Sequence, residues 1–309
     1  MNHAPAIIFE DNHIIVVIKP HGMPSQADAS ADLDLLTQLK KYRSENENKP
    51  GDAFVGLVHR LDRVTGGVMV FAKTSKAAKR LSLQIQGGEQ GHPEYGTFNK
   101  KYLAVIHGTP NTPQARLEHY LLKNEKLNKV EVVGAAISGA KRAVLTYKVL
   151  NTVDPNISTE FKITSKKESD SSPAIALQKE EFDDEPKSSR YDGLQGVKLT
   201  DAILTSFELE KQLDTPKLSL VEINLLTGRS HQIRVQFAKT GNPLFADAKY
   251  GTTKFPKNQH IDLALWAYEL TFNHPTTGQR LRFIVNPPET HPWELFEFAR
   301  KSHKNIEQI

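Results

Sequence analysis

The chain has 309 residues, with 40 Lys and Arg against 36 Asp and Glu, and therefore a formal net charge of +4. It contains no cysteine, which excludes disulfides, thiol catalysis and Cys-ligated zinc or iron–sulfur sites. No apolar run approaches the roughly 20 residues that a membrane helix needs, and no signal peptide is evident, so we expect a cytoplasmic protein without a membrane span.

In the N-terminal third, apolar periodicity and turn residues predict two strands and two helices. The first strand ends at residues 16–18 before Lys19-Pro20, a short helix spans 35–43, a buried strand spans 68–72 after Gly66-Gly67, and a second helix begins at a Thr74 or Ser75 cap. The glycines permit a sharp turn directly before the buried strand.

The rest of the chain is richer in strands. Strands are predicted at 102–106, 144–150, 221–225 and 281–285, and a helix at 230–240 that Gly241 ends. Runs of strands with few helices indicate an α+β protein with a mixed or antiparallel sheet.

A polar insertion interrupts this pattern at about residues 151–200. Between residues 158 and 190, eight acidic and six basic residues leave the segment at −2 and the remainder of the chain at +6. Seven serines and no apolar periodicity predict a solvated or disordered segment. We therefore expect a single domain over 1–309 that carries this insertion, and an acidic partner for the remainder.

The first candidate for chemistry is Asp62, which lies between Arg60 and Arg63 just before Gly66-Gly67. Neighbouring arginines favour an ionised carboxylate, which can act as a nucleophile or a general base. A structural aspartate in an Asx-turn is the alternative interpretation.

The second candidate is the segment 226–234, where Arg229, His231 and Arg234 surround the start of the predicted helix. A helix starting near Ser230 would offer free N–H groups to an anion. A solvated basic helix is the alternative. Tyr102, at the start of a strand, could stack on a base or act as an acid or base.

Read in order, these segments resemble the RluA-type pseudouridine synthases. The motifs that carry the resemblance are Lys19-Pro20-x-Gly22-x-Pro24, His59-Arg60-Leu61-Asp62-x-x-Thr65, Lys101-Tyr102, Thr227-Gly228-Arg229-x-His231-Gln232-Ile233-Arg234, Gly241-x-Pro243-x-x-x-Asp247-x-x-Tyr250-Gly251, and Leu265-Trp266-Ala267. Together they cover nearly the whole chain outside 151–200. No separate N-terminal S4 domain is expected, because the residues before His59 already match the catalytic domain.

The resemblance implies a pseudouridine synthase fold with a cleft across the sheet, and isomerisation of specific uridines in ribosomal or transfer RNA without a cofactor or metal. It implies a nucleophilic role for Asp62, packing of Tyr102 on the base with removal of the C5 proton, and pairing of Arg234 with Asp62. It also implies that Arg60 holds the flipped nucleotide.

The residues themselves add Arg229, His231 and Gln232 as RNA contacts, and we expect a monomer. Attack at C1′, attack at C6 and a glycal route all stay open.

Three departures from the family pattern stand out. Gly66 replaces the usual Ser, Trp266 replaces a common His, and Gln236 replaces another common His. A catalytically degenerate RNA-binding or ribosome-assembly factor is the alternative function, although the retained Asp62 disfavours it. A nucleotide hydrolase has no support, since no phosphate loop occurs.

Overall fold

The computed structural model describes residues 5–46, 53–90, 97–155, 217–252, 261–296 and 305–308. The chain divides into two compact units, residues 1–152 with 218–309, and residues 153–217. Nearly all of the second unit lies outside the described residues, and the polar insertion expected at about 151–200 lies there with it. The first unit carries the sheet and the site. No helix among the described residues is long and apolar enough to cross a membrane.

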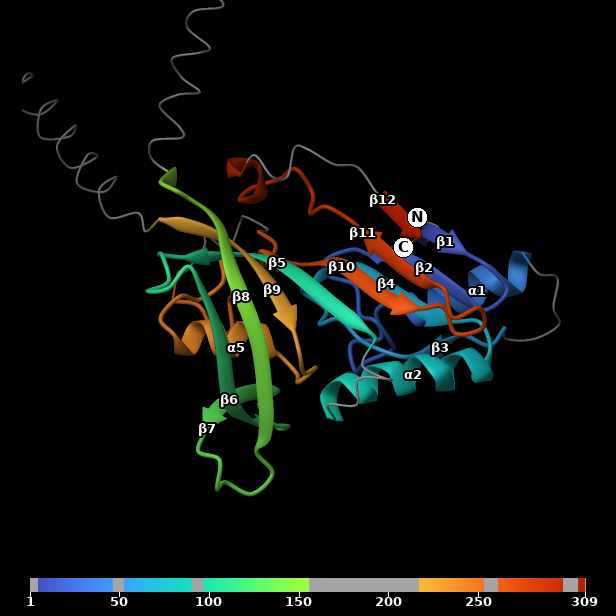
Figure 1. Cartoon of the computed structure of the whole chain (residues 1–309), viewed down its shortest axis with the longest axis horizontal. Coiled ribbons are helices and arrows are strands. Elements are labelled where there is room, and N and C mark those ends of the chain that lie inside the picture. The colour runs from blue at the N-terminus through green and yellow to red at the C-terminus, as the bar shows by residue number, and fades with distance from the viewer. Residues whose placement is uncertain are drawn as a thin grey trace, which may run out of the picture. The chain divides into compact units, whose positions relative to one another are not determined.

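The first unit is built on one twelve-stranded sheet with a few helices (Figure 1). Its strands are β1 (Ala6–Glu10), β2 (Ile14–Lys19), β3 (Gly56–Leu57), β4 (Gly66–Ala72), β5 (Asn99–His107), β6 (Gln114–Asn124), β7 (Lys129–Val133), β8 (Lys141–Val153), β9 (Leu218–Leu225), β10 (Leu265–Asn273), β11 (Arg280–Ile284) and β12 (Asn305–Gln308). Its helices are α1 (Leu35–Asn46), α2 (Ser75–Gln90), α5 (Gln232–Lys239) and the 3-10 helix η1 (Trp293–Leu295).

The strands follow the order β1-β2-β4-β10-β5-β9-β8-β6-β7, with β3 beside β4, β11 beside β10, and β12 beside β11. The pairings whose register is defined are antiparallel, except that β4 and β10 run parallel through Gly66 opposite Trp266 and Gly67 opposite Ala267. A late strand, β10, therefore separates two early strands, β4 and β5. This confirms the predicted α+β fold with a mixed, largely antiparallel sheet.

The core explains why the central strands are so apolar. β2 and β4 are buried along most of their length, as expected of strands that are covered on both faces. On the face that carries Tyr102, α1 contributes Leu35 and Leu39, and α5 contributes Ile233 and Phe237. Helix α2 packs beside β3, β4 and β10. Figure 1 shows β6, β7 and β8 as an arm that extends past α5.

The predicted elements in the described residues are all present, with shifted ends. Helix α2 is capped by Thr74, whose Oγ1 accepts a hydrogen bond from the Ala77 N–H at 3.1 Å. Helix α5 begins at Gln232 rather than near Ser230, because His231 adopts a left-handed conformation with φ of 51°. Gly241, with φ of 83°, follows the end of the helix as expected.

Candidate active site

The turn that carries Asp62 is held in place by its backbone. The Thr65 N–H donates to the Asp62 carbonyl at 3.0 Å, which closes the turn. Ser25 holds both backbone polar groups of Leu61, the residue before Asp62. Its Oγ donates to the Leu61 carbonyl at 2.8 Å and accepts from the Leu61 N–H at 3.1 Å. The peptide on the N-terminal side of Asp62 is therefore fixed before any ligand arrives.

The side chain of Lys19 holds the C-terminal side of the same turn, at the carbonyl of Arg63. The Lys19 side chain is fully buried, and Nζ donates to the carbonyls of Pro20 at 2.9 Å, Met23 at 2.7 Å and Arg63 at 3.2 Å. Burial lowers the pKa of Lys19 to about 7, although the charge of Asp62 opposes that change. The sequence marked Lys19 as part of a turn motif, but not as a support of the Asp62 turn.

The two arginines beside Asp62 have different surroundings. Arg63 points its guanidinium at Asp28, 3.1 Å away, and at Asp32 and Ser30. Arg60 is exposed and lines the pocket described below. The expectation that two arginines flank the carboxylate of Asp62 is therefore wrong for Arg63. Its guanidinium pairs instead with the acidic residues of the 28–32 loop.

The carboxylate of Asp62 is itself unengaged. Across the residues that the structure describes, no hydrogen bond or ion pair holds this side chain. The alternative interpretation, a structural aspartate in an Asx-turn, would require its carboxylate to accept a backbone N–H, and no such contact is present in these ranges. A half-buried carboxylate on a fixed turn is instead free to meet a ligand.

Tyr102 lies on β5 at the floor of the pocket. Its backbone lies opposite Ile223 of β9 and Ala267 of β10, so neighbouring strands fix it on both sides. Burial, and then the negative charge of Asp62, raises the pKa of Tyr102. The phenol therefore remains protonated at neutral pH in the free protein, and Tyr102, although only 6% exposed, lines the pocket.

Arg234 extends from α5 and is almost fully buried. It pairs with Asp247, with Nε 2.8 Å from Oδ2 and Nη2 2.6 Å from Oδ1. Burial alone would lower the pKa of Arg234, but Asp247 and then Asp62 outweigh it and raise the pKa. The expected pairing of Arg234 with Asp62 therefore needs correction: the hydrogen-bonded partner is Asp247, and Asp62 acts on Arg234 only through its charge.

Gln232 belongs to the support of the site. Its Oε1 accepts from Thr227 Oγ1 at 2.8 Å and from the Arg229 N–H at 3.1 Å, and its Nε2 donates to the Val144 carbonyl at 3.0 Å. These contacts hold the turn that presents Arg229. The anion site expected at a helix start near Ser230 does not form as expected, because the Gln232 N–H donates to the Arg229 carbonyl.

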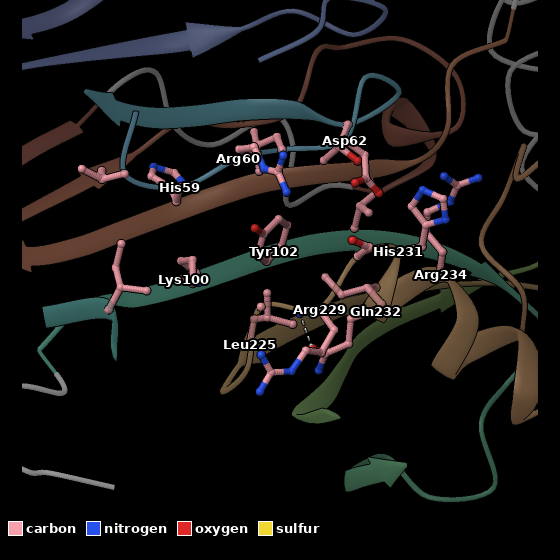
Figure 2. Close-up of a pocket in the computed structure, with 18 of the residues that line it drawn as sticks. His59, Arg60, Asp62, Lys100, Tyr102, Leu225, Arg229, His231, Gln232 and Arg234 are labelled. Carbon is pink, nitrogen blue, oxygen red and sulfur yellow. Dashed lines mark hydrogen bonds between the residues drawn. The ribbon is translucent and has the colours of Figure 1, made fainter. Parts of the chain in front are cut away.

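All seven residues singled out from the sequence line one pocket of about 420 Å³. Figure 2 shows this pocket with Asp62 and Arg60 on the turn before β4, Tyr102 on β5, and His231, Gln232 and Arg234 at the start of α5. The lining also includes Lys100 and Leu225, from the adjacent strands β5 and β9. The cleft thus crosses the middle of the sheet, as predicted.

Comparisons with known proteins identify the family of this chain. A family model described as RNA pseudouridylate synthase matches residues 13–239. Ribosomal large subunit pseudouridine synthase C of Haemophilus influenzae is 27% identical over 90% of this chain and 63% of its own length. Ribosomal large subunit pseudouridine synthase D of Zymomonas mobilis is 26% identical over 97% of this chain and 74% of its own length.

A solved structure, that of human RNA Pseudouridylate Synthase Domain Containing 4, superposes with a TM-score of 0.58 at 18% identity and covers 98% of this chain and 94% of that one. This likeness confirms the fold. The chain spans 63% to 66% of the length of the first relatives it matches.

Proposed function

The chain belongs to the RNA pseudouridylate synthase family, and we propose that it isomerises specific uridines of RNA to pseudouridine. The observation that carries the proposal is the carboxylate of Asp62, which has no hydrogen-bond partner among the described residues and lies on a fixed turn. This turn is at the edge of the pocket, and Tyr102 forms the pocket floor. Such a site offers a nucleophile without further preparation.

In the proposed reaction the C1′–N1 glycosidic bond breaks, the uracil turns, and a C1′–C5 bond forms. The proton on C5 is then lost to solvent through a base, and N1 takes up a proton from solvent. The atoms of substrate and product balance without an oxidant or an energy source. A paired uridine must first leave its helix to reach Asp62. Asp62 would assist departure of the uracil, and Tyr102 would pack on the base.

The basic residues would hold the RNA. Arg60 and Arg229 lie on opposite walls of the pocket, where they can contact phosphates, and Lys100 lies in the same lining. We propose that Arg234 contributes a fixed positive charge near Asp62, and that Gln232 acts by holding the Arg229 turn. His231 would face the nucleotide from the same side.

We propose ribosomal RNA as the substrate class, because the relatives named above are synthases of the large ribosomal subunit. Transfer RNA is the other outcome of the test. Total RNA from a deletion strain, labelled with [5-³H]uridine, should release tritium with the wild-type protein and not with Asp62→Asn. Site-by-site mapping of pseudouridine then identifies the RNA and the position.

Equal tritium release by Asp62→Asn and by the wild type would overturn the proposal. Complete rescue of a deletion phenotype by Asp62→Asn would favour the RNA-binding or ribosome-assembly role instead.

We also propose that residues 1–309 act as one catalytic domain with an insertion, as a monomer in the cytoplasm. Light scattering and cell fractionation test both statements.

A further inference from the structure

Tyr250, in the loop after α5, connects three parts of the site. Its hydroxyl accepts a hydrogen bond from the Val130 N–H of β7 at 2.9 Å and lies 2.7 Å from Nδ1 of His231. The Tyr250 and His231 rings meet edge to face, 5.6 Å apart at an interplanar angle of 70°. The guanidinium carbon of Arg234 lies 5.2 Å from the centre of the Tyr250 ring. One tyrosine therefore contacts both ionisable residues at the start of α5.

The contacts of this hydroxyl bear on which nitrogen of His231 carries the proton. A backbone N–H can only donate, so the oxygen of Tyr250 accepts from Val130. The phenol has one proton of its own, and Nδ1 of His231 is its partner within the described ranges. When Nδ1 accepts that proton, a neutral imidazole carries its own proton on Nε2.

His231 lies where this assignment matters. It lines the pocket together with Asp62, and its backbone is held in a left-handed conformation with φ of 51°. Such a conformation is unfavourable for a residue other than glycine and is often found at functional sites. Burial lowers the pKa of His231, although Asp62 opposes that change. A neutral ring either donates or accepts at Nε2, and the tautomer decides which.

We propose that Tyr250 is a positioning residue that holds the proton of His231 on Nε2, from where it donates a hydrogen bond to an acceptor oxygen of the nucleotide bound beside Asp62. The identity of that nucleotide rests on the proposed function, whereas the tautomer is a property of the free protein. The two parts can therefore fail separately.

The tautomer is tested first, without RNA. In ¹⁵N-histidine-labelled wild-type protein at neutral pH, His231 should show a pyridine-like Nδ1 and a pyrrole-like Nε2, with the signal assigned by its loss in His231→Gln. Tyr250→Phe keeps the ring over Arg234 but removes the hydroxyl, and it should mix the two tautomers. Tyr42→Phe is the control. The hydroxyl of Tyr42, on α1, donates to Glu10 at 3.0 Å, and its removal should leave the tautomer of His231 unchanged. An Nδ1–H tautomer in the wild type, or an unchanged tautomer in Tyr250→Phe, would overturn the proposal.

The second test uses the labelled RNA described above under single-turnover conditions. Tyr250→Phe should lower the rate about tenfold, or about 1.4 kcal/mol in activation free energy, and leave the Kd for RNA within about twofold. The double variant Tyr250→Phe/His231→Gln should be no slower than His231→Gln alone, because both changes remove the same hydrogen bond. Additive losses would show that Tyr250 acts by another route and would also overturn the proposal. If the wild type formed no pseudouridine, only the proposed function would fail.

Discussion

Gly66 lies directly opposite Trp266 in the parallel pairing of β4 with β10, and the indole fills the space that a side chain at Gly66 would need. A Cβ at Gly66 would come within 2.8 Å of Cε3 of the indole and closer still to Cζ3. Gly66 and Trp266 are two of the positions where this sequence departs from the family pattern. They form a matched pair, in which the larger residue on β10 requires the smaller one on β4.

The first prediction concerns that pair. Gly66→Ser should lower the free energy of unfolding by about 1–3 kcal/mol, because the added side chain overpacks a buried site. In a Trp266→His background the same change should cost much less, since the smaller ring leaves room. Denaturant unfolding of the four proteins measures the coupling. Gly134→Ser is the control, because nothing lies within 4 Å of a Cβ at that position. Equal costs in both backgrounds would contradict the matched pair.

The second prediction concerns the buried ion pair of Arg234 and Asp247. Asp247→Asn should lower the free energy of unfolding by about 3–5 kcal/mol, because it leaves a buried guanidinium without its counter-charge. Denaturant titration measures this loss. The control is Asp32→Asn, which removes a partner of Arg63 in an exposed ion pair and should change stability little. Similar losses in both variants would show that burial does not distinguish the two pairs.

The third prediction concerns pH and His59. Burial lowers the pKa of His59 to about 3, and its Nε2 accepts a hydrogen bond from the Val70 N–H at 3.1 Å. Because the unfolded histidine titrates near 6.5, the unfolded state binds the extra proton first as the pH falls. His59 therefore lowers stability progressively from about pH 6.5 to 3, by at most about 1.4 kcal/mol per pH unit.

His59→Gln tests this contribution, because its amide oxygen can accept from Val70 without titrating. Its free energy of unfolding should fall less steeply than that of the wild type between pH 6.5 and 4. Parallel pH profiles of the two proteins would show that His59 does not contribute.

The fourth prediction separates the two arginines beside Asp62. Arg60 lines the pocket, whereas Arg63 is bound to Asp28 and Asp32. Arg60→Gln should weaken RNA binding and reduce the slope of log K against log salt by nearly one, as expected when one phosphate contact is lost. Arg63→Gln should leave the slope unchanged. Filter binding at several salt concentrations measures both, and equal slopes for the two variants would argue against this assignment.

The sequence predicted the class of fold and the residues that gather at the pocket, because both leave local patterns. Alternating or continuous apolar runs marked the central strands, and ordered motifs marked Asp62, Tyr102 and Arg234. The partner of Arg234 was not predictable from spacing, since two carboxylates compete for one guanidinium and only the folded chain places Asp247 against it. Lys19 and Tyr250 were part of recognised motifs, but their roles depend on contacts with Arg63 and Val130, which are distant in sequence.

The start of α5 was missed for a different reason. The residues from Ser230 onward have a helical pattern, but the left-handed conformation of His231 delays the start of the helix by two residues, to Gln232. A positive φ is uncommon for any residue other than glycine, so the helical pattern did not indicate it. The ring contact and hydrogen bond to Tyr250 come from tertiary structure, and they accompany a backbone that sequence patterns would not suggest.

The position of β10 has a consequence for how the protein is made. Asp62 precedes β4 and Tyr102 lies on β5. In the sheet that the structure describes, these two strands are joined through β10, which is synthesised more than 150 residues after both. In a ribosome-bound chain that ends before Leu265, β10 has not yet brought the turn of Asp62 beside the strand of Tyr102. The pocket is therefore assembled only when β10 inserts, so the activity proposed above would have to await the synthesis of β10.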